Sequence, residues 1–141
     1  MLGLVVVTHG NLGKTMLETA QTITGIHAER VALVEVSWND PMDEIESKVR
    51  EAIQKVMSDQ GVIIVTDMFG GTPSNVSLAF VGEGPIAVVT GVNLPMFMVF
   101  LNHQNSMDYT EMARHMKKRG VDSIMSSLDV LPDLHLVDKE S

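Results

Sequence analysis

The sequence contains no cysteine, which excludes a disulfide scaffold, a thiol nucleophile and a cysteine-based zinc or iron–sulfur site. Basic residues are also few: 10 Lys and Arg stand against 18 Asp and Glu, for a formal charge of −8. This balance argues against nucleic acid as a partner, because binding to phosphates needs a basic surface. No apolar run is long enough for a signal peptide or a spanning helix. We therefore expect a soluble, cytoplasmic protein that does not insert into a membrane.

The composition that remains is that of a globular domain. Hydrophobic residues make up 45% of the chain and charged residues 20%, which excludes disorder as a description of the whole. A length of 141 residues suits one hydrophobic core of ordinary size and leaves no room for a second. We therefore expect one domain over residues 1–141.

Apolar, β-branched runs alternate along the chain with amphipathic stretches. The runs are typical of parallel strands buried on both faces, and they cover residues 2–8, 31–36, 61–66 and 86–90. The stretches predict helices over residues 12–24, 41–57, 73–80, 94–101 and 109–118. Asp40 is a candidate N-cap of the second helix. The alternation predicts a three-layer α/β fold: an open, mostly parallel sheet with helices on both faces, to which residues 134–137 could add a late antiparallel edge strand.

The loop after the first predicted strand nearly forms a phosphate-binding P-loop. Gly13, Lys14 and Thr15 match the end of the GxxxxGK[ST] pattern, and Asp67 ends the third strand as a magnesium-binding carboxylate would. However, Thr8 stands where a glycine should open the loop, so the backbone cannot easily form the nest of amides that wraps phosphates. A small nucleotide-binding protein is therefore the weaker alternative.

His9 offers a different chemistry at the same strand end, where open sheets of this kind bind their ligands. Histidine can act as nucleophile or base near neutral pH. Asp67, on a strand expected to neighbour the first, could accept a hydrogen bond from one ring nitrogen and leave the other free to attack. The remaining histidines lie outside the main loops, and we expect structural or surface roles for them: they are His27, His103, His115 and His135.

The loop after the third predicted strand has the features of an anion site. Gly70 and Gly71 let the backbone approach a ligand closely, and Gly10 gives similar freedom beside His9. Thr72 is a candidate cap of the following helix, and its hydroxyl could bond a phosphoryl oxygen. The sequence has no GxSxG motif, histidine triplet or evident carboxylate cluster, so we expect neither a metal nor another cofactor. A phosphoryl group carried on His9 fits these residues best.

Three segments together resemble the IIA component of the mannose-type (mannose/fructose/sorbose) bacterial phosphotransferase system. They are THG at residues 8–10, DMFGGTPSN at 67–75 and GVNLPM at 91–96, and the resemblance covers at least residues 1–101. Phe69 departs from the family pattern, in which tryptophan is common at this position.

The resemblance implies a histidine phosphocarrier in sugar uptake. His9 would accept a phosphoryl group from the phosphorylated carrier protein HPr and pass it to a IIB component. Asp67 would match the carboxylate that orients the histidine, and Thr72 a hydroxyl near the phosphate. The family also implies a homodimer in which a late antiparallel strand can be exchanged, for which residues 134–137 are the candidate.

Docking of these partners needs a shallow apolar surface around His9, for which Phe69, Leu94, Pro95 and Met96 are candidates. The acidic surface could steer a basic face of a partner toward it. We expect the IIB component to be a separate polypeptide, and any membrane association to be peripheral, through the transporter. A regulatory sensor that is phosphorylated without serving a transporter is the alternative.

Overall fold

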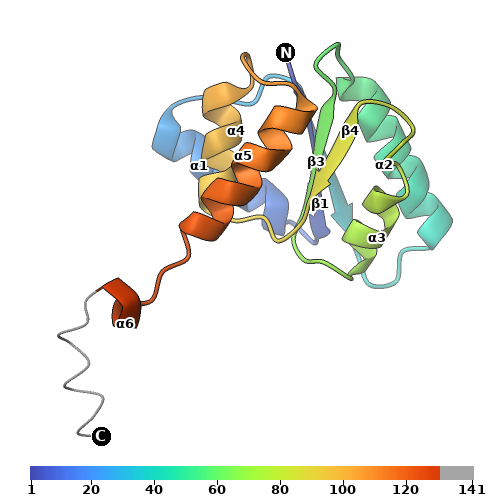
Figure 1. Ribbon diagram of the computed structural model, residues 1–141. Coiled ribbons are helices and arrows are strands. Elements are labelled where there is room, and N and C mark those ends of the chain that lie inside the picture. Colours follow the sequence, from blue (N-terminus) through green and yellow to red (C-terminus); the bar gives the residue numbers. More distant parts are fainter. Residues whose placement is uncertain (131–141) are drawn as a thin grey trace, which may run out of the picture.

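Four parallel strands form one sheet in the computed structural model, which describes residues 1–130 (Figure 1). The strands are β1 (Gly3–His9), β2 (Val31–Val36), β3 (Val62–Thr66) and β4 (Ile86–Val89), in the order β2-β1-β3-β4. All four coincide closely with predicted strands, because continuous β-branched runs are a strong local signal. The expected neighbourhood of the first and third strands is confirmed: Val7 of β1 pairs with Thr66 of β3.

Helices cover both faces of the sheet, which confirms the three-layer α/β fold (Figure 1). One face carries α2 (Met42–Val56) and α3 (Thr72–Leu78). The other carries α1 (Leu12–Thr24), α4 (Leu94–His103) and α5 (Tyr109–Asp122). A short α6 (Ser127–Val130), which the sequence did not predict, follows and extends away from the sheet. The candidate strand at 134–137 lies outside the described residues.

Alternation along β1 determines on which face His9 lies. Leu4 and Val6 are buried in the core beneath α1, α4 and α5, whereas Val5 and Val7 are buried beneath α2 and α3. Successive side chains of a strand point to opposite faces, so His9 continues the series of Val5 and Val7. The imidazole therefore emerges on the face of α2 and α3, at the carboxyl end of the central strand.

The predicted cap of the second helix is wrong. Pro41, in extended conformation, occupies the N-cap position of α2 and offers no side-chain cap. Asp40 therefore lies one residue too early to reach the free amides of the first turn. Its carboxylate instead accepts a hydrogen bond from the backbone amide of Ser37 at 2.8 Å, which closes the loop between β2 and α2.

Candidate active site

His9 and Asp67 meet at the carboxyl ends of two neighbouring strands. His9 is the last residue of β1, and Asp67 follows the last residue of β3. One carboxylate oxygen, Oδ2, accepts a hydrogen bond from the backbone amide of His9 at 2.9 Å and lies 2.7 Å from its Nδ1. The other oxygen, Oδ1, accepts from the amide of Met68 at 3.0 Å. Asp67 thus holds both the backbone and the ring of His9.

The two side chains differ in their access to water. The Asp67 side chain is only 10% exposed, whereas that of His9 is 48% exposed. Burial alone would raise the pKa of the Asp67 carboxyl, but hydrogen bonds from the amide and ring of His9 outweigh it and hold that pKa below its usual value. Asp67 is therefore ionised near neutral pH and can only accept hydrogen bonds. It follows that Nδ1 carries the proton in this contact, so that in the neutral imidazole Nε2 is the nitrogen with the lone pair.

The start of α3 lies directly beside the imidazole of His9. A Cβ atom at Gly71 would stand 3.2 Å from Cε1 of His9 and 3.8 Å from Nε2. The absence of a side chain at Gly71 thus lets the backbone lie close to the imidazole, and the expected approach to a ligand stays a prediction. A Cβ atom at Gly10 or Gly70 would have no other atom within 4 Å. Both residues nevertheless have positive φ, +53° and +88° respectively, a backbone conformation that favours glycine.

A buried hydroxyl that sequence reasoning missed holds this loop in place. Ser74 accepts a hydrogen bond from the amide of Gly70 at 2.9 Å and donates one to the carbonyl of Gly71 at 3.1 Å. The predicted capping role of Thr72 is wrong, because α3 already begins at Thr72, with Gly71 as its N-cap. The sequence did contain a signal for this role: a serine three residues after a glycine N-cap. From that position a side chain can reach back to the backbone at the start of the helix.

The near-match to a P-loop has a structural explanation. Gly13 packs so closely on β1 that a Cβ atom would collide with Val6, and its amide donates to the hydroxyl of Thr8 at 2.9 Å. The glycine is thus required for packing of α1 against the strand, and its amide is already bonded within the protein. Thr8, which replaces the first P-loop glycine, supplies that bond.

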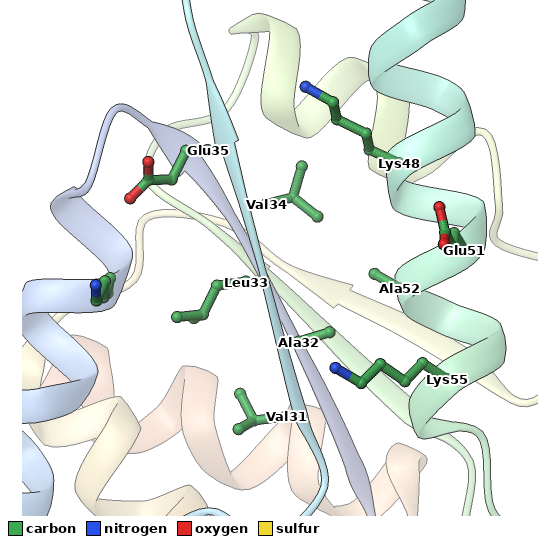
Figure 2. Close-up of a pocket in the computed structure, with 10 residues that line it drawn as sticks. Val31, Ala32, Leu33, Val34, Glu35, Lys48, Glu51, Ala52 and Lys55 are labelled. Atoms are coloured by element: carbon green, nitrogen blue, oxygen red, sulfur yellow. The ribbon is translucent and has the colours of Figure 1, made fainter.

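Lys14 lines a hollow along the outer edge of β2, with a volume of about 750 Å³ (Figure 2). In Figure 2, Lys48 and Lys55 reach from α2 toward the same strand. His9 and Asp67, by contrast, lie at the ends of β1 and β3, on the inner side of β2 in the sheet. The hollow at β2 is therefore a separate feature from the histidine site.

The candidate docking residues differ in exposure. Phe69, two residues after Asp67, is 75% exposed. Leu94 and Pro95 are partly buried at the start of α4. Met96 is only 3% exposed and packs against Gly120 of α5, so its prediction as a docking residue is wrong. The side chain of Asn93 caps α4 by accepting a hydrogen bond from the Met96 amide. This bond fixes the first helical turn, in which Met96 is the third residue and faces the core.

The other histidines within residues 1–130 lie away from this site. His103 and His115 contact each other edge to face, with ring centroids 5.2 Å apart, on the layer of α4 and α5. His27 lies between α1 and β2, and His135 lies outside the described residues. Within residues 1–130, no three His, Asp or Glu side chains are grouped so that they could hold a metal ion. No helix in that part of the chain is both long and apolar enough to cross a membrane.

Comparison with known proteins gives consistent results. Residues 3–117 match the family model described as the PTS system fructose IIA component. The chain is 23% identical over 118 residues to the fructose-specific EIIA component of the PTS system of Bacillus subtilis (strain 168), covering 83% of this chain and 80% of the relative. It is 28% identical over 98 residues to the mannose-specific EIIAB component of Escherichia coli (strain K12). That match covers 69% of this chain but only 30% of the relative.

A solved structure gives the same result for the fold. The PTS IIA protein associated with the fucose utilization operon of Streptococcus pneumoniae superposes with a TM-score of 0.76 at 25% sequence identity. The match covers 92% of this chain and 96% of that one.

Proposed function

The chain belongs to the mannose/fructose-type IIA family of the phosphotransferase system, and on this premise we propose that His9 takes a phosphoryl group from phosphorylated HPr and passes it to a IIB component. Membership itself establishes a phosphotransferase component that works with phosphocarrier and IIB proteins. The observation that carries the proposal for His9 is the 2.7 Å contact between its Nδ1 and Oδ2 of Asp67, which leaves Nε2 free.

The proposed transfer needs only these two side chains and the donor. The lone pair of Nε2 attacks the phosphorus of the donor phosphohistidine in line, and the donor's N–P bond breaks with its electron pair returning to the donor ring. The proton on Nδ1 stays in place, hydrogen-bonded to Asp67. The phosphorylated ring of His9 is then stabilised by the carboxylate. Transfer to IIB is the same step with His9 as the donor.

The phosphoryl oxygens would lie against the loop that begins α3. Gly10, Gly70, Gly71 and Thr72 are the proposed contacts. The proposed donors are the amides of Gly71 and Thr72 and the Thr72 hydroxyl, because the amides of Gly10 and Gly70 already donate to Val36 and Ser74. Gly71 supports this because it already lies against the edge of the ring that carries Nε2. No metal or cofactor takes part in the proposed step.

The homodimer and the cytoplasmic location expected from the sequence stay predictions. The choice between carrier and sensor depends on whether a IIB protein accepts the group from His9.

The direct test of the proposal incubates the protein with phosphoenolpyruvate, Enzyme I and HPr and records its intact mass. We expect the gain of one phosphoryl group that is lost on mild acid treatment. Absence of a gain, with HPr phosphorylated in the same tube, contradicts the proposal.

Substitution of Gly71 by alanine should slow phosphoryl acceptance without unfolding the protein. The new Cβ would stand 3.2 Å from Cε1 of His9, so the ring or the loop must shift by a few tenths of an ångström. We expect roughly a tenfold lower rate at saturating donor, because small misplacements of a reacting group are costly. Gly84→Ala is the matched control, since a Cβ there meets no atom within 4 Å. Equal rates for the two variants would show that the ring tolerates the intrusion.

Substitution of Lys14 by alanine tests the remaining nucleotide-binding alternative. Lys14 lies at the hollow beside β2, and the Gly13 amide is already bonded to Thr8. We expect unchanged acceptance from phosphorylated HPr, and no ATP or GTP binding by the wild-type protein in isothermal calorimetry with magnesium. Nucleotide binding that disappears in Lys14→Ala would support the P-loop interpretation instead.

A further inference from the structure

The outer edge of β2 presents backbone groups that have no partner within residues 1–130. β2 is the end strand of the sheet and pairs only with β1 there. The carbonyls of Arg30 and Val36 accept hydrogen bonds from amides at the two ends of that neighbouring strand. In a strand the N–H and C=O of one residue point to the same side, and successive residues alternate. The N–H and C=O groups of Val31, Leu33 and Glu35 therefore point outward.

The side chains of β2 do not close this edge to a further strand. Edge strands are commonly protected by lysine or proline, which discourage another strand from pairing with them. The six residues of β2 include neither, and Leu33, in the middle of the strand, is 42% exposed. Val31 packs against the core beneath α1, so Leu33 and Glu35 lie on that same face by alternation. The edge is therefore open and apolar at its centre.

Lysines flank the edge from both layers of helices. The hollow along β2 has a volume of about 750 Å³, which is in the range of ligand-binding clefts. Lys14 lines it from α1, and Lys48 and Lys55 line it from α2. In Figure 2, Lys48 and Lys55 extend from α2 toward β2, whereas the carboxylate of Glu51 stays beside the helix. A strand added to β2 would thus meet basic groups on both sides.

These lysines are little used by the protein itself. Lys14 and Lys55 form no salt bridge within the part of the chain that the structure describes. Lys48 meets Glu44 at 3.7 Å, an exposed pair of a kind that contributes little. Three of the 10 Lys and Arg of this acidic chain thus line one hollow. The ligand that complements them is acidic.

The two faces of the edge differ in chemistry. On the α2 face, Lys48 and Lys55 are seven residues apart, or about 10 Å along the helix. On the α1 face, Leu33 is accompanied by one lysine and one glutamate, Lys14 and Glu35, which leave no net charge. Alternate residues of a strand face the same side, with a repeat of about 7 Å. A strand that fits therefore has acidic residues at alternate positions, toward α2, and apolar residues between them, toward Leu33.

We propose that the outer edge of β2 binds an extended segment of a partner protein in which acidic and apolar residues alternate. The segment adds to the sheet as a further strand, with backbone hydrogen bonds to the outward groups of β2 and carboxylates toward Lys48 and Lys55. This inference goes beyond the proposed function and is independent of it. His9 lies at the end of β1, whereas this surface runs along the side of the sheet.

The first test uses a fluorescein-labelled hexapeptide of alternating Glu and Val with blocked ends, and follows its anisotropy as the protein is added. We expect saturable binding that weakens as salt is raised and is absent when Lys replaces Glu in the peptide. Methylation of the peptide amides separates strand addition from simple charge attraction. Methylating one alternate set should abolish binding and methylating the other should not, because only one set faces β2. Equal effects of the two sets, or no binding at millimolar protein, overturn the proposal.

Amide hydrogen exchange locates the bound peptide. Exchange at Leu33 and Glu35, whose amides point outward, should slow tenfold or more when the peptide is saturating. Exchange at Ala32 and Val34, whose amides face β1, should not change. Unchanged exchange at Leu33 and Glu35 in the saturated complex overturns the proposal. Protection that appears without peptide and grows with protein concentration assigns the edge to a second copy of the chain, and also overturns it.

Paired variants test the role of the lysines. Lys48→Gln combined with Lys55→Gln should weaken peptide binding about tenfold or more. Lys117→Gln combined with Lys118→Gln removes the same charge from the exposed face of α5 and should leave the affinity unchanged. Equal affinities of the two double variants overturn the proposal. Both should accept a phosphoryl group from HPr as the wild type does, and failure of the wild type to do so would contradict the proposed function without affecting peptide binding.

Discussion

Replacing His9 by alanine is expected to abolish phosphoryl uptake, so that the intact mass of the variant stays unchanged after incubation with phosphoenolpyruvate, Enzyme I and HPr. The variant removes Nε2, the only atom to which the proposed mechanism attaches the group. Because the His9 side chain is 48% exposed and takes no part in the core, the fold should persist, with an unfolding temperature within a few degrees of wild type.

The matched control is His27→Ala, which removes another exposed histidine and leaves the site untouched. The backbone carbonyl of His27 accepts a hydrogen bond from the side-chain amide of Gln104 at 2.9 Å, and alanine retains that carbonyl. The control should gain one phosphoryl group as the wild type does. Uptake by His9→Ala would mean that another residue is the acceptor and that the His9–Asp67 contact has a structural role.

Replacing Asp67 by asparagine is expected to slow phosphoryl transfer by about 10²-fold or more, in the range of losses for acid–base and orienting groups. The acceptor nitrogen remains, so uptake should still reach one group per chain after long incubation. The cause is the loss of a charged acceptor for the proton on Nδ1. An amide can donate to Nδ1, which favours the wrong tautomer and leaves the phosphorylated ring without its counter-charge. Rapid-quench measurement of uptake from phosphorylated HPr checks this, and a rate within twofold of wild type would contradict the orienting role.

The same variant has a pH signature. The pKa of Asp67 is lowered in the folded protein, so its ionised form adds stability that is fully present above the ordinary aspartate pKa of about 3.9 and is lost as pH falls toward the lowered value. Asp67→Asn lacks this dependence. We therefore expect wild type to lose stability relative to the variant as the pH falls below about 4, measured by thermal unfolding at pH 7 and pH 3. Parallel curves would contradict it.

Much of the fold and the central pair of the site follow from local sequence. The runs at β1 and β3 are apolar, rich in β-branched residues and almost wholly buried, so both are recognisable as strands of a parallel sheet. That they are neighbours is an expectation from the doubly wound topology, and the pairing confirms it. Once the two strands are neighbours, a histidine at the end of one and an aspartate after the other must lie close together. The sequence therefore predicts that the two side chains are close, and the structure adds the 2.7 Å contact.

What could not be predicted depends on contacts between distant segments or on one-residue shifts. Met96 lies in the first turn of a predicted helix, and only the packing of its sulfur against Gly120 of α5 shows that it faces the core rather than the surface. Thr72 was predicted as a cap because α3 was expected to begin at residue 73, and the actual start gives the supporting hydroxyl role to Ser74.

We propose above all that Nε2 of His9 carries the phosphoryl group while Nδ1 keeps its proton toward Asp67. The most direct test is nuclear magnetic resonance of the phosphorylated protein with ¹⁵N-labelled histidine, in which coupling to ³¹P identifies the nitrogen bonded to phosphorus. We predict ¹⁵N–³¹P coupling at Nε2 of His9 and a hydrogen-bonded proton on Nδ1. Coupling at Nδ1, or at the ring of any other histidine, would contradict the account.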